Sequence, residues 1–398
     1  MVDLGYGDAG KGTVVDALCA AGPVTAVIRF NGGAQAAHNV VTAGGRHHTF
    51  AQFGSGTLQG VPTHLSRFVV VDPLALAAEA AALGNPFELL TVDADAPLAT
   101  VWHQAANRVR ERRRGGARHG SCGLGVGETI AYALSHPSAP RVADVRSPAR
   151  LRRRLAAVRD NLSAELGPLD APPLDDVVAA FVEFGRAVSI VDFSHVARLL
   201  AGGPCVFEGA QGVLLDEWRG WHPYTTWSTT TFDNVGALCD GFLRLGVVRT
   251  YTTRHGAGPF VTEAPLHLPE AHNGVGEWQG AFRVGHFDAV AHRYAVEVAG
   301  GIDALAVTHL DAADPELRIC TSYDLDGARW DRIVPGPLRD LAYQAGLTSL
   351  LSRARPGELY RPADWATAIG AELGAAVLIE SHGPRTGDKR IRTLSVNI

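Results

Sequence analysis

Residues 1–13 read MVDLGYGDAGKGT, a short apolar run followed by a glycine-rich turn that ends at a lysine. Residues 1–4 favour a short strand, and the sequence from Lys11 to residue 22 favours a helix. Glycines let backbone N–H groups approach an anion, and the N-terminus of the following helix favours negative charge. This strand, turn and helix predict a phosphate-binding loop.

The turn nearly fits the phosphate-loop pattern GxxxxGK[ST]. Gly5, Gly10 and Lys11 have the required spacing. Gly12, however, stands where a hydroxyl residue would hold magnesium. A structural turn with a chance lysine is the alternative interpretation, since glycine-rich turns are common. Asp8 argues against it, because a carboxylate inside a phosphate loop would repel a nucleotide unless it binds a metal or removes a proton.

Further apolar runs rich in β-branched residues recur along the chain, separated by Ala- and Leu-rich stretches typical of helices. They occupy residues 24–30, 67–72, 204–210, 245–251, 302–311 and 375–381. Continuous runs of this kind are typical of strands buried on both faces. They predict an α/β fold with a mostly parallel central sheet flanked by helices. The whole chain, 1–398, is expected to form a single domain with a helical insertion around 141–173.

Composition narrows the class of protein. With 46% hydrophobic and 19% charged residues the chain is typical of a globular protein, and it has no apolar run of the ~20 residues that span a bilayer, so we expect no membrane partner. Five cysteines without a CxxC pair indicate neither a disulfide framework nor a zinc site. A net charge of -5 gives no field that would attract nucleic acid. The N-terminus reaches the turn too soon for a secretion signal, so a cytoplasmic location is expected.

Several segments resemble landmarks of the adenylosuccinate synthetase family, whose phosphate loop reads approximately WGDEGKGK. NGGAQAAHNVV, VVVDPLAL, FEGAQGVLLD, PYTTWSTTT and YTTRHGAGPFVTE are similar to the family's GGxNAGHT, VVVDPxxL, FEGAQGxLLD, PYVTSSNTT and TTRxGAGP segments. THLD and SHGP near the C-terminus resemble TKLD and STGP. The landmarks occur in family order over nearly the whole chain, so together they are far more specific than a glycine motif alone.

The resemblance implies an adenylosuccinate synthetase-like fold related to P-loop NTPases, and a homodimer. Family members transfer the γ-phosphate of GTP to the 6-oxygen of IMP, and the amine of aspartate then displaces that phosphate. For this chain it implies purine metabolism, with GTP as co-substrate and Mg²⁺ as cofactor. The expected partners are small molecules, namely GTP, a purine-like nucleotide and an amine or amino acid.

Three residues would carry the chemistry if family roles are transferred by position. Asp8 would take the N1 proton of the purine and bind magnesium, with the backbone carbonyl of Ala37 as a second metal ligand. His38 would be the acid that stabilises charge on the purine oxygen and the transferred phosphate. Gln211 would act at the purine base. Taken alone, His38 is one of sixteen histidines and would more often be a packing or surface residue; its place in the GGAQAAH segment reverses that expectation.

Two further sets of residues would bind the nucleotides. Asp311 would accept hydrogen bonds from the guanine N1 and N2 groups and so favour GTP over ATP. The resemblance implies GTP binding by Gly10, Lys11, Gly12, Thr13, His309, Asp311, Ser381, Gly383 and Pro384. It implies acceptor-nucleotide binding by Ser121, Cys122, Gln211 and Thr230. GSCGLG at 120–125 is similar to the family's GTTGRG turn, but Leu124 replaces its arginine. The acceptor is therefore expected to be IMP or a related nucleotide.

The segment expected to bind the amine departs from the family. The family's loop reads approximately TTGRRRRTGWLD and supplies arginines to both carboxylates of aspartate, whereas EWQGAFRVGHFD stands at 277–288. Charge-assisted hydrogen bonds contribute roughly 1.5–3 kcal/mol each, so their loss disfavours aspartate. A shifted alignment, with other arginines serving, is the alternative. The residues expected at the amine are Thr253, His255, Trp278 and Arg283.

The sequence thus predicts a GTP- and Mg²⁺-dependent C–N ligase that activates a purine-like nucleotide by phosphorylation and then accepts an amine that need not be aspartate. Two alternatives stay open. The first is a GTP-dependent small-molecule kinase without amine attack. The second is a non-catalytic nucleotide-binding protein, which the presence of a carboxylate in the phosphate loop disfavours.

Overall fold

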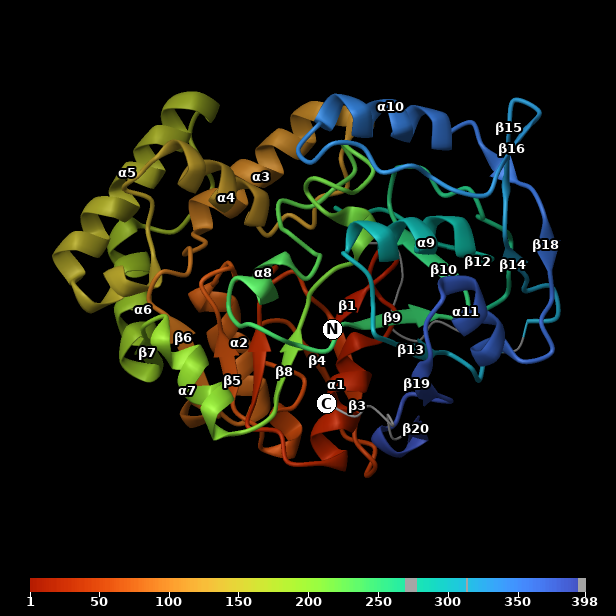
Figure 1. Cartoon of the computed structure of the whole chain (residues 1–398). Helices are drawn as coiled ribbons and strands as arrows, with labels where there is room; N and C mark the ends of the chain where they lie inside the picture. The colour runs from red at the N-terminus through yellow and green to blue at the C-terminus, as the bar shows by residue number, and fades with distance from the viewer. Residues whose placement is uncertain (269–277, 313, 393–398) are drawn as a thin grey trace. The chain divides into compact units, whose positions relative to one another are not determined.

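The chain, in a computed structural model that describes residues 1–268, 278–312 and 314–392, divides into two compact units. Unit 1 comprises Met1–Ala17, Asn39–His48 and Gln211–Ile398, and unit 2 comprises Leu18–His38 and Thr49–Ala210. Each unit has a five-stranded sheet (Figure 1). The single domain expected from the sequence stays a prediction.

The sheet of unit 1 has the strand order β1-β9-β13-β19-β20. Its strands are β1 (Val2–Asp3), β9 (Leu245–Arg249), β13 (Ala304–Thr308), β19 (Val377–Ser381) and β20 (Lys389–Ile391). The first four are parallel, and β20 is antiparallel to β19. Every residue of β9 and β13 is buried, as expected for central strands with both faces covered. The loops after β1, β9, β13 and β19 consequently leave from the same edge of the sheet.

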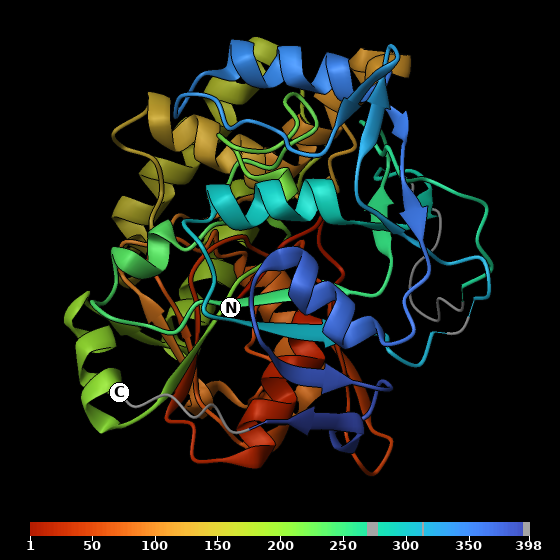
Figure 2. The same cartoon turned by 45° about the vertical axis from the view of Figure 1, so that its right-hand side comes forward.

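Over its described residues, unit 1 also contains smaller sheets and four helices beyond α1 (Lys11–Ala21), which begins in unit 1. The strands are β10 (Thr252–His255), β11 (Phe282–Gly285), β12 (Phe287–Asp288), β14 (Ile319–Cys320), β15 (Tyr323–Leu325), β16 (Ala328–Trp330), β17 (Arg355–Pro356) and β18 (Leu359–Tyr360). The helices are α8 (Asp233–Gly236), α9 (Ala289–Val298), α10 (Leu341–Leu351) and α11 (Trp365–Leu373). Helix α11 packs on α9, β13 and β19 (Figures 1 and 2).

The sheet of unit 2 is wholly parallel, with the strand order β7-β6-β5-β2-β8. Its strands are β2 (Ala26–Arg29), β5 (Thr63–Leu65), β6 (Leu90–Asp93), β7 (Ser189–Val191) and β8 (Cys205–Glu208). The short pair β3 (His38–Val41) and β4 (His47–Phe50) carries the chain from unit 2 into unit 1 and back. All four residues of β2 are buried.

Six helices accompany this sheet in unit 2. They are α2 (Pro73–Leu83), α3 (Val101–Arg114), α4 (Val126–Ser135), α5 (Pro148–Leu166), α6 (Leu174–Ala187) and α7 (Ser194–Gly202). Helix α2 shows how the sequence sets the ends of a helix. The Asp72 side chain accepts from the backbone N–H groups of Leu74 and Ala75, Pro73 occupies the first turn, and Gly84 ends the helix with φ of 92°. Helix α5 forms most of the segment 141–173.

The mostly parallel α/β architecture predicted from the sequence is confirmed, with one wrong strand and four missed strands in the two five-stranded sheets. Residues 67–72 form only isolated bridges, Gly33 with Val70 and Val71 with Leu98, although Val69, Val70 and Val71 are buried. Burial explains the apolar pattern without a strand. The strands β5, β6, β7 and β20 lie outside the predicted runs, and each is only three or four residues long. Over the described residues, no helix has the length and apolar character needed to cross a membrane.

Candidate functional site

The phosphate loop of unit 1 is built around the carboxylate of Asp3, the last residue of β1. Asp3 accepts hydrogen bonds from the backbone N–H groups of Gly5 at 2.8 Å, Gly7 at 3.3 Å and Ala9 at 2.8 Å. The Lys11 ammonium lies 3.2 Å from the same carboxylate, and both side chains are buried. A buried carboxylate is stable only when it is hydrogen-bonded and paired, and here the loop itself supplies the partners.

The backbone of this loop adopts conformations that favour glycine. Gly7 and Gly10 have φ of 98° and 88°, and Asp8 has φ of 61°. Helix α1 begins directly afterwards at Lys11, and the first N–H groups of a helix have no acceptor within it. These N–H groups at the head of α1, which include those of Gly12 and Thr13, form an anion-binding site of the expected kind.

A second loop of unit 1, which begins at the end of the FEGAQG segment, packs on the phosphate loop. A Cβ added to Gly212 would lie 2.2 Å from Gly5 O and 2.4 Å from Gly7 N, so only glycine fits there. The backbone carbonyl of Gln211 accepts from Lys11 Nζ at 2.7 Å. The Lys11 ammonium is therefore held both by Asp3 and by this loop.

Gln211, a predicted catalytic residue, has φ of 62°, and its Nε2 donates to Thr226 Oγ1 at 2.7 Å. Its Oε1 is buried and has no hydrogen-bond partner within the described part of the chain. A buried acceptor of this kind requires a ligand or water to satisfy it. Thr230, whose place at the acceptor stays a prediction, holds the loop: its Oγ1 donates to Gly212 O at 3.1 Å and its N–H donates to Asp216 Oδ2 at 2.6 Å.

The Asp8 side chain is 27% exposed and lies next to a histidine. Oδ2 of Asp8 is 3.3 Å from Nε2 of His255, the last residue of β10. Burial by itself raises the pKa of Asp8, but the hydrogen bond from His255 and the charges of His255, Arg249 and Lys11 outweigh it, so the net shift of the pKa is downward. Asp8 is therefore an ionised carboxylate within the phosphate loop.

The predicted guanine-side residues gather in unit 1 at the ends of β13 and β19. Asp311 follows β13 and is exposed, whereas Ser381 is buried at the end of β19, and its Oγ donates to Gly383 O at 3.2 Å. Pro384 O accepts from Thr13 Oγ1 at 3.1 Å, which ties this segment to helix α1. The loops after two neighbouring parallel strands are a common place for a nucleotide.

His309, which stands where the family has lysine, is engaged by Arg249. Its Nε2 lies 2.6 Å from Nη2 of Arg249, and its Nδ1 lies 2.8 Å from Thr308 Oγ1. Burial, followed by the charges of Arg249 and Lys389, holds the pKa of His309 well below its ordinary value. The ring is therefore neutral at pH 7 and accepts a hydrogen bond from the Arg249 guanidinium. Contact of His309 with a guanine base stays a prediction.

The hairpin expected at the amine pairs β10 with β11, and its arginine is already bound. Arg283 contacts the Glu263 carboxylate through Nε at 3.0 Å and through Nη2 at 2.5 Å. Thr253 Oγ1 accepts from Arg249 Nη1 at 3.2 Å. Trp278 is half-buried, and Glu277, the first residue of the compared loop, lies outside the described residues.

Unit 2 contains the predicted acid His38, and the structure adds a partner. His38 Nδ1 lies 2.6 Å from Glu208 Oε1, and the exposed fractions of the two side chains are 7% and 0%. Glu208 also accepts from Ser55 N at 3.0 Å and Ser55 Oγ at 2.5 Å. Arg29 is its register partner across β2 and β8. Burial alone raises the pKa of Glu208, but Arg29, His38 and Ser55 lower it to about 2.

The turn predicted at the acceptor phosphate is also in unit 2, ahead of helix α4. Ser121 Oγ donates to Asn107 Oδ1 at 2.7 Å, and Cys122 is half-buried, with burial raising the pKa of its thiol. Gln35, in the GGAQAAH segment, has both side-chain amide atoms buried without partners among the residues described. The orphan amide marks Gln35 as a ligand-binding candidate that the sequence did not single out.

The residues named for magnesium fit a lightly coordinated ion. No group of three or more His, Cys, Asp or Glu side chains that could hold a metal occurs in the described ranges. Mg²⁺ usually takes one or two carboxylates together with substrate phosphates, so a dedicated cage is not needed. The partly exposed carboxylate of Asp8, set in an anion-binding loop, suits this coordination, and Ala37 is exposed.

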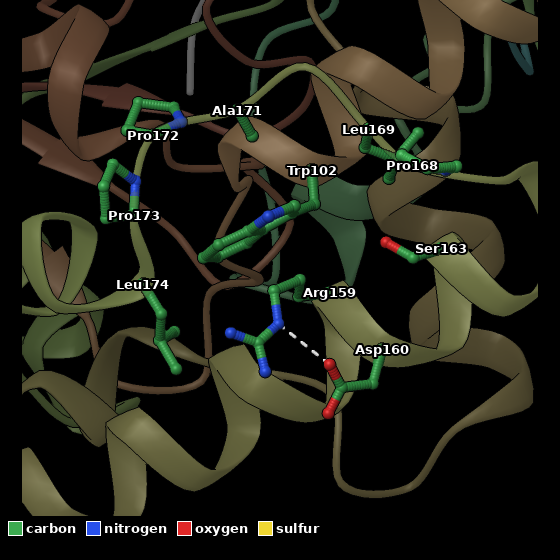
Figure 3. Close-up of a pocket in the computed structure, with 10 residues that line it drawn as sticks. All are labelled: Trp102, Arg159, Asp160, Ser163, Pro168, Leu169, Ala171, Pro172, Pro173 and Leu174. Carbon is green, nitrogen blue, oxygen red and sulfur yellow. Dashed lines mark hydrogen bonds and ion pairs between the residues drawn. The ribbon is translucent and has the colours of Figure 1, made fainter.

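Unit 2 also has a groove of about 560 Å³ that is separate from the predicted site residues. Figure 3 shows the Trp102 indole beside Arg159 and Asp160 of α5, with Pro172 and Pro173 along the rim. No residue predicted to bind GTP, acceptor or amine lines this groove.

Besides Gln35, the sequence did not point to three residues that shape the site: Asp3, Glu208 and Glu263. A charged residue inside an apolar run was the available signal for Asp3 and Glu208, because such residues are rarely buried unless paired. Glu263 gave no such signal, since its partner lies 20 residues away along the chain.

Comparisons with known proteins give the same family over most of the chain. The family model for adenylosuccinate synthetase matches residues 1–348. Adenylosuccinate synthetase from Synechococcus sp. (strain RCC307) is 35% identical over 353 residues, which cover 81% of this chain and 78% of that protein. The enzyme of the same name from Acidithiobacillus ferrooxidans is 35% identical over 362 residues, covering 85% and 83%.

Two solved structures share the fold. A fully ligated adenylosuccinate synthetase from Plasmodium falciparum has a TM-score of 0.84 at 20% identity, covering 98% of this chain and 99% of that one. Cyanophage S-2L succinoaminodeoxyadenylate synthetase (PurZ), bound to dGMP and to dATP as an energy donor, has a TM-score of 0.62 at 19% identity, covering 98% and 93%.

Proposed function

The chain belongs to the adenylosuccinate synthetase family, and from this premise we propose that it uses GTP to phosphorylate the 6-oxygen of IMP or a related purine-like nucleotide and then replaces the phosphate with an amine. Membership makes the chain a GTP- and Mg²⁺-dependent ligase that forms a C–N bond in purine metabolism. What we propose beyond this is the identity of the acceptor and of the amine, the phosphorylated intermediate, and the roles of single residues.

The proposed reaction has two balanced steps. In the first, Asp8 takes the N1 proton, the purine oxygen bonds to the γ-phosphorus of GTP, and the bond from that phosphorus to the bridging oxygen breaks as GDP leaves. In the second, the amine nitrogen bonds to C6 and loses a proton, and the C6–O bond breaks as phosphate leaves. His38 donates a hydrogen bond to the oxygen that bears the phosphate.

The ionised Asp8 carboxylate carries this proposal. A general base must be unprotonated, and the lowered pKa of Asp8 keeps it so. Mg²⁺ would be held by Asp8 and would neutralise phosphoryl charge. The hydrogen bond to Glu208 supports the role of His38, since a carboxylate at Nδ1 fixes the orientation of the ring.

The acceptor is proposed as a purine-like nucleotide rather than as IMP alone. PurZ, which shares the fold, binds dGMP and uses dATP as its energy donor, so this architecture accommodates more than one purine. Leu124, in place of the family's arginine, supports an altered phosphate contact in this chain.

Oxygen labelling tests the proposal. IMP that carries ¹⁸O on C6 is incubated with the protein, GTP, Mg²⁺ and a panel of amines. The masses of the phosphate and nucleotide products are then measured by mass spectrometry. The proposal expects ¹⁸O in the released phosphate together with a C–N product. Label that stays in a phosphorylated nucleotide indicates the kinase without amine attack, and tight GTP binding without GDP formation over an acceptor panel indicates a non-catalytic protein.

A further inference from the structure

The end of strand β10 contacts the phosphate loop of unit 1 through two neighbouring residues. The guanidinium of Arg254 lies 4.4 Å from the ring centroid of Tyr6. His255, the last residue of the strand, has its Nε2 3.3 Å from Oδ2 of Asp8. Tyr6 and Asp8 are two positions apart in the loop, so the strand and the loop meet at two points, one of which is the carboxylate of the proposed base.

The first of these contacts is part of a buried hydrogen-bond network. Arg254 is 2% exposed, and its Nη1 donates to the carbonyl oxygen of Pro259 at 3.2 Å. The hydroxyl of Tyr6 donates to the same oxygen at 3.2 Å and accepts from Trp221 Nε1 at 2.8 Å. Because buried groups with satisfied hydrogen bonds are held firmly, this network fixes where the strand ends and so where His255 lies.

The imidazole of His255 is also packed against an aromatic neighbour. His255 pairs with Phe282 across the β10–β11 hairpin, and the two ring centroids are 4.9 Å apart with the planes tilted by 57°. This separation is within the range of favourable aromatic contacts. A ring packed in this way has fewer orientations available to it, so its Nε2 stays beside the Asp8 carboxylate.

The direction of the hydrogen bond follows from the state of Asp8. An ionised carboxylate can only accept, so Nε2 of His255 carries the hydrogen and donates it to Oδ2. A hydrogen bond to the charged form of an acid makes the carboxylate a weaker base, not a stronger one. The contact therefore contributes orientation to Asp8 rather than basicity.

The histidine is a feature of this chain and not of the family pattern. His255 stands at the position written x in the family's TTRxGAGP segment, where the pattern specifies no residue, whereas Arg254 stands at its arginine. The family's chemistry therefore does not by itself call for an imidazole here. The place expected for His255 at the amine stays a prediction, and the contact with Asp8 is separate from it.

We propose that His255 is a positioning residue for phosphoryl transfer: it donates from Nε2 to Asp8 Oδ2 and holds the carboxylate so that Oδ1, which does not share this bond, takes the N1 proton of the acceptor. The inference rests on the proposed ligase function and adds a residue to its first step. A general base acts only within hydrogen-bond reach of the proton that it removes, and a small misplacement lowers the rate steeply. Holding the carboxylate still therefore raises kcat.

The test compares three substitutions of His255 that differ in where they place a donor. His255→Gln carries an amide N–H near the position of Nε2, His255→Asn carries the same amide one carbon closer to the backbone, and His255→Leu has no donor. His267→Leu is the control, because His267 is an exposed histidine of the same unit. GDP formation is measured with GTP, Mg²⁺, the acceptors IMP, GMP and dGMP, and the amines ammonia, glycine and aspartate, over a range of GTP concentrations.

His255→Leu and His255→Asn should each lower kcat about tenfold while KM for GTP changes less than about threefold. His255→Gln should keep at least about a third of the wild-type kcat, and His267→Leu should match wild type. A residue that only packs would make Gln and Asn alike. Wild-type kcat in His255→Asn and His255→Leu would overturn the inference, and so would a loss in His255→Gln as large as that in His255→Asn.

A double-mutant cycle shows whether His255 acts through Asp8. Once Asp8→Asn has removed the carboxylate, the imidazole has no base to orient, so adding His255→Leu should change the remaining rate less than about twofold. The same tenfold loss in both backgrounds would show that His255 acts independently of Asp8. Melting followed by circular dichroism identifies any variant that misfolds, and the comparison of Gln with Asn stands without the leucine variant.

Failure of the underlying function gives a different result. Absence of GDP formation by wild-type protein with all three acceptors would refute the proposed phosphoryl transfer to these nucleotides, and the inference would fall with it. Wild-type turnover that the folded His255 variants retain in full would refute the role of His255 alone and leave the ligase proposal intact.

Discussion

His38 Nδ1 and Glu208 Oε1 are 2.6 Å apart within unit 2, and neither side chain is more than 7% exposed. Glu208 closes strand β8 beside Arg29 of β2, and Ser55 donates to it twice. A carboxylate with this many donors stays ionised in the interior and fixes the orientation of the imidazole. The pair links the stability of unit 2 to the residue proposed to act on the purine oxygen.

Stability should depend on pH through Glu208. Its pKa falls from 4.5 to about 2 on folding, so the unfolded chain binds the proton at higher pH. The stabilisation is complete above pH 4.5 and is lost as pH falls towards 2, a change of about 3 kcal/mol. Urea unfolding between pH 6 and pH 2.5 should show the difference between wild type and Glu208→Gln shrinking by that amount. Glu183→Gln, exposed on α6, is the control; a difference that does not vary with pH would contradict the assignment.

Loss of the proposed base or acid should stop chemistry and spare binding. Asp8→Asn removes the acceptor of the N1 proton, and His38→Asn removes the donor to the purine oxygen. Each should lower acceptor-dependent GDP formation by at least about a hundredfold, the usual contribution of general acid–base catalysis. Fluorescence titration with a GTP analogue should change less than tenfold. Asp176→Asn, on the exposed face of α6, should match wild type. Turnover retained in either active-site variant would refute that residue's role.

The contact between the two loops of unit 1 should be intolerant of a methyl group. Gly212→Ala forces a Cβ against Gly5 O and Gly7 N, so we expect a loss of about 1–3 kcal/mol in unfolding free energy and at least tenfold weaker GTP binding. Gly346→Ala is the opposite case. Gly346 is exposed within α10, with no atom near the added Cβ, and alanine there should stabilise by about 0.5–1 kcal/mol. Equal effects of the two substitutions would show that the loop contact is unimportant.

The preference for GTP should depend on Asp311. It is exposed directly after β13, where an acceptor could pair with the guanine N1 and N2 groups. Asp311→Asn replaces a charged acceptor by a neutral one, so the ratio of kcat/KM for GTP to that for ATP should fall about tenfold. Steady-state assays with both nucleotides measure this ratio. An unchanged ratio would place guanine selection in other residues.

Much of the fold was readable from the sequence because its long apolar runs coincide with buried parallel strands. The strand, loop and helix at 1–22 are the clearest case, and β9, β13 and β19 lie within predicted runs. The strand predicted at residues 67–72 is wrong, because burial imposes the same apolar pattern on a segment that forms only isolated bridges. Strand β7, at Ser189–Val191, is too short for periodicity to reveal.

The candidate site was readable only in part. The motifs singled out Asp8, Lys11 and His38 as candidates, because each lies in a segment with its own pattern. They could not identify Glu208 as the partner of His38, since the two are 170 residues apart and meet through the arrangement of unit 2. Likewise, Arg283 appeared in the sequence as the last available cation of its loop. Only the hairpin register and the position of Glu263 show that the guanidinium of Arg283 already pairs with a carboxylate of the protein.

The collar of N–H groups around Asp3 has a consequence for the catalytic cycle. Because Asp3 accepts from the N–H groups of Gly5, Gly7 and Ala9 and pairs with Lys11, these contacts hold the loop in shape before any nucleotide arrives. The entropy cost of ordering the loop is therefore incurred during folding and not again each time GTP binds. This preorganisation favours rapid association and tight binding of GTP. A phosphate loop of this kind can release GDP and bind GTP once per turnover without refolding.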